Sequence, residues 1–65
     1  MTIVLNGEKV DIKAASLIDA LVELGYQDAK IATALNEEFV PETLRATIVL
    51  NDGDRLEILA PMQGG

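Results

Sequence analysis

The sequence predicts an α+β domain in which one main helix packs across one face of a mixed sheet of four to five strands. Short segments rich in β-forming residues, bounded by turn residues, occur at both ends of the chain. Only one segment shows clear helical spacing of apolar residues. The length of 65 residues allows one small domain and excludes a second.

The first element is a hairpin. Thr2 to Leu5 and Glu8 to Ile12 flank Asn6-Gly7, a pair typical of a type I′ turn because both residues tolerate positive φ. A two-residue turn fixes the register, so Ile3 is expected opposite Val10. The apolar residues of one face are then Met1, Ile3, Leu5, Val10 and Ile12. This face needs a cover.

A short helix is predicted to supply that cover. Ser16 and Asp19 have the spacing of a capping box, and Gly25 provides a left-handed stop. Leucines recur between them at helical spacing, at Leu17, Leu21 and Leu24. A helix of about two turns is unstable alone in water, so it must be held by packing on the hairpin.

Further strands are predicted in the second half. Lys30 to Asn36 forms a strand, and Asn36 to Glu38 turns the chain into a short Phe39-Val40 strand that Pro41 terminates. The turn Asp52-Gly53-Asp54 leads into Arg55 to Leu59, with Leu56 and Ile58 on one face.

Thr-Ile-Val-Leu-Asn occurs twice, at residues 2–6 and 47–51. The flanking sequences differ, which favours coincidence of β-prone composition over a structural repeat. Whether Thr47 to Asn51 forms a strand is open from the sequence; it could pair with the last strand across the Asp52-Gly53 turn. Glu42 to Ala46 is a connection that could include one helical turn.

The order hairpin, helix, strands favours a crossed, partly parallel sheet, and the β-grasp (ubiquitin-like) arrangement satisfies these constraints. We expect residues 1–60 to form the domain. Residues 61–65 are expected to be a flexible C-terminal tail that ends in Gly64-Gly65.

Composition excludes several kinds of chemistry. The chain has no cysteine or histidine, which removes disulfides, thiolate nucleophiles, ordinary zinc sites and the commonest general base. No metal site and no catalytic residue are therefore expected, and Asp52 and Asp54 are interpreted as turn formers. The net charge of −6 disfavours nucleic acid and anionic membranes and favours a basic protein partner.

The chain is also expected to be soluble and cytoplasmic. No apolar run approaches the roughly 18 to 20 residues that span a bilayer. Met1 to Leu5 leads directly into a hairpin instead of a basic and then apolar leader.

Gly64-Gly65 is the candidate functional element. Two residues without Cβ atoms make a thin strip, so the terminal carboxylate can enter a slot too narrow for side chains. Such a carboxylate could attack the α-phosphate of ATP, and a sulfur or amine nucleophile could displace the resulting adenylate. The small body would then be a handle for a partner that supplies ATP and catalytic groups.

Three parts of the chain carry a family resemblance: Ala34-Leu35-Asn36-Glu37-Glu38-Phe39-Val40-Pro41, then Leu50-Asn51-Asp52-Gly53-Asp54-Arg55-Leu56-Glu57-Ile58, and the terminal Gly64-Gly65. Together they resemble the ThiS family of thiamine-biosynthesis sulfur carriers, and the resemblance covers essentially the whole chain.

The resemblance implies a β-grasp protein that is a cosubstrate rather than an enzyme and binds no cofactor itself. A ThiF-like adenylyltransferase would activate Gly65 with ATP, and a cysteine desulfurase pathway would supply the sulfur of a Gly65 thiocarboxylate. Thiazole synthase ThiG would receive that sulfur for thiazole formation. Gly64 would provide clearance in the partner's slot.

Phe39, Leu59, Met62 and Gln63 are candidates for a partner interface, since they lie near strand ends and the tail; core packing is the alternative for Phe39 and Leu59. A monomer is expected, because the tail must enter different pockets in turn. Alternative functions are a molybdopterin-synthase small-subunit-like sulfur carrier, a TGS-like interaction module, or a ubiquitin-like modifier.

Overall fold

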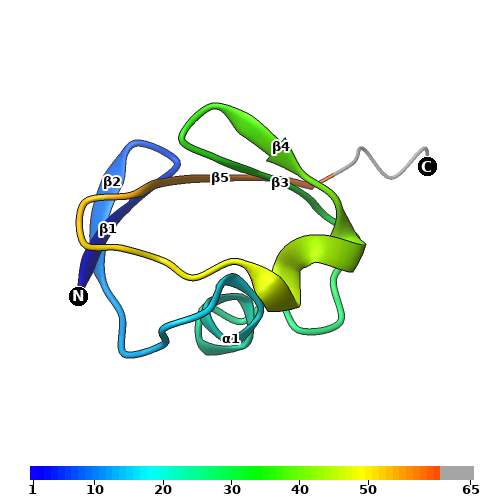
Figure 1. The fold of residues 1–65 in the computed structure, drawn as a ribbon, viewed down its shortest axis with the longest axis horizontal. Helices are drawn as coiled ribbons and strands as arrows, with labels where there is room; N and C mark the ends of the chain where they lie inside the picture. The colour runs from blue at the N-terminus through cyan, green and yellow to red at the C-terminus, as the bar shows by residue number, and fades with distance from the viewer. Residues whose placement is uncertain (61–65) are drawn as a thin grey trace.

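The computed structural model describes residues 1–60; the predicted tail, residues 61–65, lies outside the described part. The elements are β1 (Thr2–Leu5), β2 (Glu8–Asp11), α1 (Leu17–Glu23), β3 (Ala32–Leu35), β4 (Glu38–Val40), the 3-10 helix η1 (Glu42–Thr47) and β5 (Arg55–Leu59). They form two layers, with the sheet above and α1 and η1 below it (Figure 1). The predicted α+β architecture is confirmed.

The sheet has five strands in the order β2-β1-β5-β3-β4. The central pair, β1 and β5, is parallel, while the other neighbours are antiparallel. The last strand therefore inserts between the two hairpins, as Figure 1 shows. This is the crossed, mixed pairing that the element order predicts.

The first hairpin has the predicted register, with Ile3 opposite Val10. Asn6 and Gly7 have φ values of 48° and 86°, so both turn residues occupy the left-handed region, as a type I′ turn requires. The pairing continues past the ends of the strands, because the backbones of Met1 and Ile12 exchange two hydrogen bonds of 2.8 Å.

Helix α1 covers the hairpin as predicted. The Ser16 hydroxyl accepts a hydrogen bond of 3.2 Å from the Asp19 N–H, and Gly25 follows the helix with a φ of 91°. The core contains apolar residues from both layers: Ile3, Ile12, Leu17, Ala20, Leu21, Val40, Leu50, Leu56 and Ile58. Burial of this face holds a helix of only seven residues.

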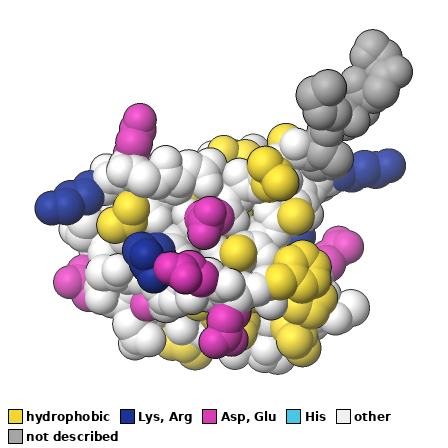
Figure 2. Space-filling model, turned by 90° about the horizontal axis from the view of Figure 1, so that it is seen from above, with side chains coloured by type: hydrophobic (Ala, Val, Ile, Leu, Met, Phe, Trp, Pro, Cys, Tyr) yellow, Lys and Arg dark blue, Asp and Glu magenta, His cyan; other side chains and the backbone are white. Residues whose placement is uncertain are grey.

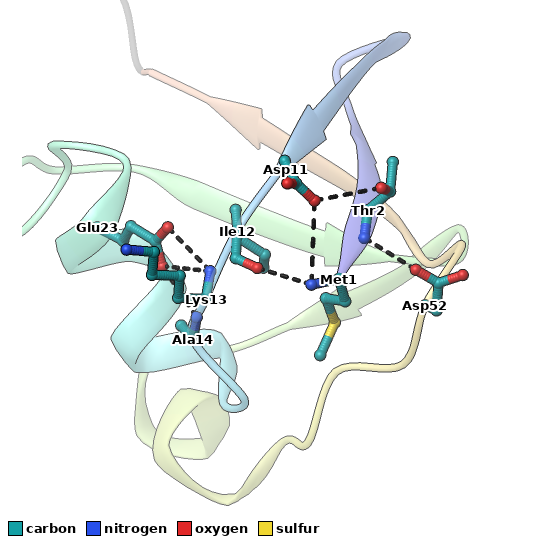
Figure 3. Close-up of polar contacts among 8 residues, drawn as sticks. All are labelled: Met1, Thr2, Asp11, Ile12, Lys13, Ala14, Glu23 and Asp52. Carbon is teal, nitrogen blue, oxygen red and sulfur yellow. Dashed lines mark hydrogen bonds and ion pairs between the residues drawn. The ribbon is translucent and has the colours of Figure 1, made fainter.

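The carboxylate of Glu23, at the end of α1, fixes the connection between β2 and the helix. Its oxygens accept hydrogen bonds of 2.9 to 3.0 Å from the backbone N–H groups of Lys13 and Ala14 (Figure 3). The side chain is exposed, but it replaces strand pairing for two N–H groups.

The second hairpin joins β3 and β4 through Asn36 and Glu37, with φ values of 51° and 72°. β3 is shorter than the predicted segment from Lys30 to Asn36. Its neighbour β5 ends at Leu59, opposite Ala32, so residues 30 and 31 have no partner strand in the described part of the chain.

The second copy of the repeat, Thr47 to Asn51, is not a strand and does not pair with β5. Val49 forms an isolated bridge with Ser16, and Leu50 donates to the Ala15 carbonyl at 2.8 Å. Both edges of β5 are occupied by β1 and β3. The pairing with β5 across the Asp52-Gly53 turn, which the sequence left open, therefore does not form.

Within residues 1–60, no helix is long and apolar enough to cross a membrane.

Candidate functional site

Two of the predicted site residues, Phe39 and Leu59, lie in the described structure. Met62, Gln63, Gly64 and Gly65 lie outside it. The structure therefore shows the body that carries the tail, up to the end of β5, and the surface around that point.

Phe39 and Leu59 project from the outer face of the sheet, opposite α1. They are 69% and 72% exposed, so neither packs in the core. Strand alternation explains the placement of Leu59, because Leu56 and Ile58 of β5 are buried on the inner face while Arg55, Glu57 and Leu59 are exposed. The core alternative for both residues is wrong.

A shallow hollow separates the two side chains. On the outer face, Phe39 pairs with Ala34, and Leu59 pairs with Ala32. The alanine side chains are too small to fill the space between their larger neighbours, and they line a hollow of about 420 Å³ together with Phe39 and Leu59. We call these four residues the outer patch.

The outer patch has a mixed border. Figure 2 views this side of the molecule and shows hydrophobic side chains gathered over one half of the face, with acidic side chains beside them. The carboxylate nearest in the sheet is Glu57, which pairs with Ala34 and lines the same hollow. Exposed apolar side chains with a charged border are typical of a protein interaction surface.

A polar cluster that the sequence did not indicate lies beneath the sheet near the same end. Arg45 of η1 is only 7% exposed. Its Nε donates to the Thr33 hydroxyl at 3.2 Å, and its Nη2 donates to the Ile31 carbonyl at 2.7 Å. Thr33 in turn donates to the Val40 carbonyl at 2.8 Å. Arg45 thus connects η1 to the second hairpin, although nothing in the local sequence distinguishes it from a solvated arginine.

Asp54 forms a hydrogen bond within the turn, as its interpretation as a turn former requires, whereas Asp52 ties the turn to β1. Asp52 accepts a hydrogen bond of 2.8 Å from the Thr2 N–H. Asp54 accepts from the Asn51 N–H at 2.8 Å and from the Asn36 side chain at 3.1 Å. Among residues 1–60, no group of three or more potential metal ligands comes together.

Comparison with known proteins gives a family for this body. Residues 3–65 match the sequence model of the ThiS family. The chain is 42% identical over 66 residues to a thiazole synthase of Paramagnetospirillum magneticum, of which it spans 20%. It is 38% identical over 61 residues to the sulfur carrier protein ThiS of Thermus thermophilus, and that match covers 94% of this chain and 95% of the relative. The chain thus spans about a fifth of the first relative and nearly all of the second.

Comparison with solved structures supports the same family. The fold is similar to the crystal structure of the thiamine biosynthesis protein ThiS from Geobacter metallireducens, with a TM-score of 0.84, 26% identity and full coverage of both chains. A solution structure of a thiamine biosynthesis protein from the same organism gives a TM-score of 0.79 at 26% identity, covering all of this chain and 88% of that one. These matches confirm the predicted β-grasp fold.

Proposed function

The chain belongs to the ThiS family, the sulfur carriers of thiamine biosynthesis, and we propose that it carries sulfur on the terminal carboxyl group of Gly65. The single observation that carries this proposal is the match of the ThiS family model to residues 3–65, which include Gly64-Gly65. Gly64 provides the clearance that lets the carboxylate enter a narrow slot.

The chain acts as a cosubstrate. Its sequence contains no cysteine or histidine, so the commonest nucleophilic and general-base side chains are missing. Catalytic groups and ATP therefore come from a partner enzyme, and the carrier contributes binding energy and position.

The proposed cycle has three steps. In a ThiF-like adenylyltransferase, a Gly65 carboxylate oxygen attacks the α-phosphorus of ATP and pyrophosphate leaves. A persulfide supplied through a cysteine desulfurase then displaces AMP to form an acyl disulfide, and a thiol of the partner enzyme cleaves its S–S bond, which releases the Gly65 thiocarboxylate and leaves a disulfide on the partner. Thiazole synthase ThiG takes the sulfur for thiazole formation, and the carboxylate is regenerated with an oxygen from water or substrate.

The outer patch supports a docking role for this body. Phe39 and Leu59 are exposed on the face beside the end of β5, and Met62 and Gln63 follow in sequence. A partner that takes the tail can cover this patch at the same time. Burial of one large apolar side chain contributes about 1.5 to 3 kcal/mol, which is enough to change affinity more than tenfold.

The relative in Paramagnetospirillum magneticum supports the choice of thiazole synthase as the consumer of sulfur. That protein is named a thiazole synthase and contains a stretch 42% identical to this chain. A carrier-like segment within the same polypeptide indicates that the two activities work together. We further propose that the carrier is a cytoplasmic monomer, since it must reach several enzymes of one pathway.

Intact-mass analysis of the chain purified from thiamine-producing cells tests the proposal. A fraction of the molecules should show one terminal oxygen replaced by sulfur, and deletion of Gly65 should abolish this species while the fold remains intact. Glu8→Gln, an exposed change on β2, is the control and should retain the sulfur. Persistence of the shifted mass without Gly65, or conjugates to lysine side chains, would contradict the carrier role.

Growth separates the pathways. Loss of the carrier should create a requirement for thiazole, and the intact chain should restore growth without it. A strain that instead loses molybdenum-cofactor enzymes and needs no thiazole would identify the molybdopterin alternative.

A further inference from the structure

Arg45 carries the most deeply buried charge among residues 1–60, and no carboxylate neutralises it there. The ion pairs of the described residues involve Met1 with Asp11 and Arg55 with Glu37. The hydrogen-bond partners of Arg45 are a neutral hydroxyl and a carbonyl. A buried charge without an opposite charge is unfavourable. Binding of an anion to this guanidinium would therefore be favourable.

The geometry leaves donors free for such an anion. A guanidinium has five N–H donors, and the bonds to Thr33 and Ile31 use two of them. Nη1 has no partner among the described residues, and no fully buried polar side-chain atom lacks one, so Nη1 reaches the surface. That surface is an open groove of about 670 Å³ that Arg45 lines with Lys30 and Leu59.

Nearby carboxylates do not fill this role. Asp28 and Glu42 line the same groove, but neither forms an ion pair with Arg45 in the described structure. The bonds to Ile31 and Thr33 hold the guanidinium toward the second hairpin. The groove therefore presents a fixed cation at its wall.

The position of the groove connects it to the tail. Leu59 lines both this groove and the hollow of the outer patch, and it is the last residue of β5 before the tail. A protein that covers the outer patch and takes the tail would also close over the groove. Closure would remove the remaining water from Arg45, where a carboxylate bound by the planar guanidinium gives a short, charge-assisted, two-point contact.

We propose that Arg45 is a docking site for an acidic side chain, an aspartate or glutamate carboxylate, of the adenylyltransferase that activates the tail. The inference rests on the proposed function. It assigns the one buried cation of the described residues to partner recognition, on a chain whose net charge is −6 and whose other surfaces favour a basic partner.

Side-chain NMR of the intact chain tests the anion site directly. Titration with sodium acetate should shift the Arg45 Nε–H signal in a saturable way, and sodium chloride at equal concentration should not. Arg55, which is exposed and paired with Glu37, is the internal reference and should move little. If the Arg45 signal does not shift with acetate, or shifts equally with chloride, Arg45 is not a carboxylate-binding site and the proposal is overturned.

The same experiment distinguishes the chain's own carboxylate as the occupant. A chain whose terminal carboxyl group is converted to an amide should give an unchanged Arg45 signal in acetate-free buffer. A shift on amidation would assign the groove to the tail itself and overturn the docking proposal.

Kinetics test the partner. In ATP–pyrophosphate exchange by the adenylyltransferase, Arg45→Gln should raise the KM for the carrier about tenfold or more with kcat unchanged, since loss of a buried charge pair mainly weakens binding. Arg45→Lys keeps the charge but loses the planar guanidinium, so its KM for the carrier should lie between those of the intact chain and the Arg45→Gln variant. Arg55→Gln removes the same charge from an exposed site and should change KM less than about twofold.

Equal KM values for the Arg45 and Arg55 variants would overturn the proposal. Thermal unfolding of each variant checks its fold, and Arg45→Lys serves if Arg45→Gln does not fold. If the intact chain supports no exchange at all, the proposed function fails, while the acetate titration still decides whether Arg45 binds a carboxylate.

Discussion

The side-chain amide of Asn6 forms both hydrogen bonds of a strand pair with the backbone of Ile58. Its Nδ2 donates to the Ile58 carbonyl at 3.1 Å, and its Oδ1 accepts from the Ile58 N–H at 2.9 Å. The backbone of Asn6 has already turned into the hairpin, so the side chain continues the pairing between β1 and β5. The first turn of the protein thereby holds the end of the strand that leads to the tail.

Removal of this amide should lower stability. Asn6→Gly keeps a residue that tolerates a φ of 48° but deletes both hydrogen bonds, so we expect a loss of about 1 to 3 kcal/mol. Asn51→Gly is the same change in the second copy of the repeat, where no side-chain hydrogen bond of Asn51 occurs within residues 1–60. Urea unfolding measures both, and equal losses would show that the amide contributes nothing.

Glu37 occupies the left-handed region, with a φ of 72°, where the first hairpin has Gly7. Glu37→Gly relieves a backbone cost of about 1 kcal/mol. It also removes an exposed ion pair with Arg55 at 3.1 Å, and such pairs contribute about 0 to 1 kcal/mol. We expect a small net gain in the free energy of unfolding. Glu38→Gly, one residue later in β4, should instead destabilise the protein. A lower free energy of unfolding for both variants would contradict the proposed backbone strain at Glu37.

Glu23 should matter more than its exposure suggests. Glu23→Ala leaves the N–H groups of Lys13 and Ala14 without their acceptor and should cost about 1 to 3 kcal/mol. Glu57→Ala removes another exposed carboxylate, whose side chain forms no hydrogen bond in the described residues, and should change stability by less than about 0.5 kcal/mol. Thermal unfolding of the two variants compares them directly.

Thr33 links Arg45 to the Val40 carbonyl and is 1% exposed. Thr33→Val keeps the shape but removes both the acceptor for Nε and the donor to Val40, so a loss of about 1 to 3 kcal/mol is expected. Thr43→Val makes the same replacement at an exposed position of η1 and should have little effect. A neutral Thr33→Val would mean that water replaces the hydroxyl.

The outer patch should affect partner recognition without affecting the fold. Leu59→Ser or Phe39→Ser should raise the KM for the carrier in the adenylyltransferase reaction about tenfold, since either change removes a large exposed apolar side chain from the proposed interface. Val22→Ser is the control, because Val22 is an exposed apolar residue of α1 on the opposite layer. Unchanged unfolding midpoints with unchanged KM would remove the patch from the interface.

Local features of the fold could be predicted because they depend on neighbouring residues. The Asn6-Gly7 turn fixes the register of its own hairpin, and the Ser16 cap and Gly25 stop bound α1. Alternation along β5 correctly separated Leu56 and Ile58 from the outward residues. The proposal that Gly65 is the functional terminus rests on its glycine pair, on the family resemblance and on the lack of other reactive groups, and it stays a prediction.

Long-range features depended on the tertiary structure. The first copy of Thr-Ile-Val-Leu forms β1, which pairs with β5, whereas Val49 of the second copy forms only an isolated bridge with Ser16, because β1 and β3 occupy both edges of β5. The hydrogen bonds between Asn6 and Ile58, which are 52 residues apart, could not be predicted from local sequence pattern. The same holds for the bond between Arg45 and Thr33. The sequence by itself determined most of the elements and the family, since local pattern and composition carry them, and it is also the basis on which Gly65 is proposed as the functional terminus. The tertiary structure alone decided that Phe39 and Leu59 share an exposed face and that Arg45 is a buried cation beside it, because burial depends on which distant segments pack together.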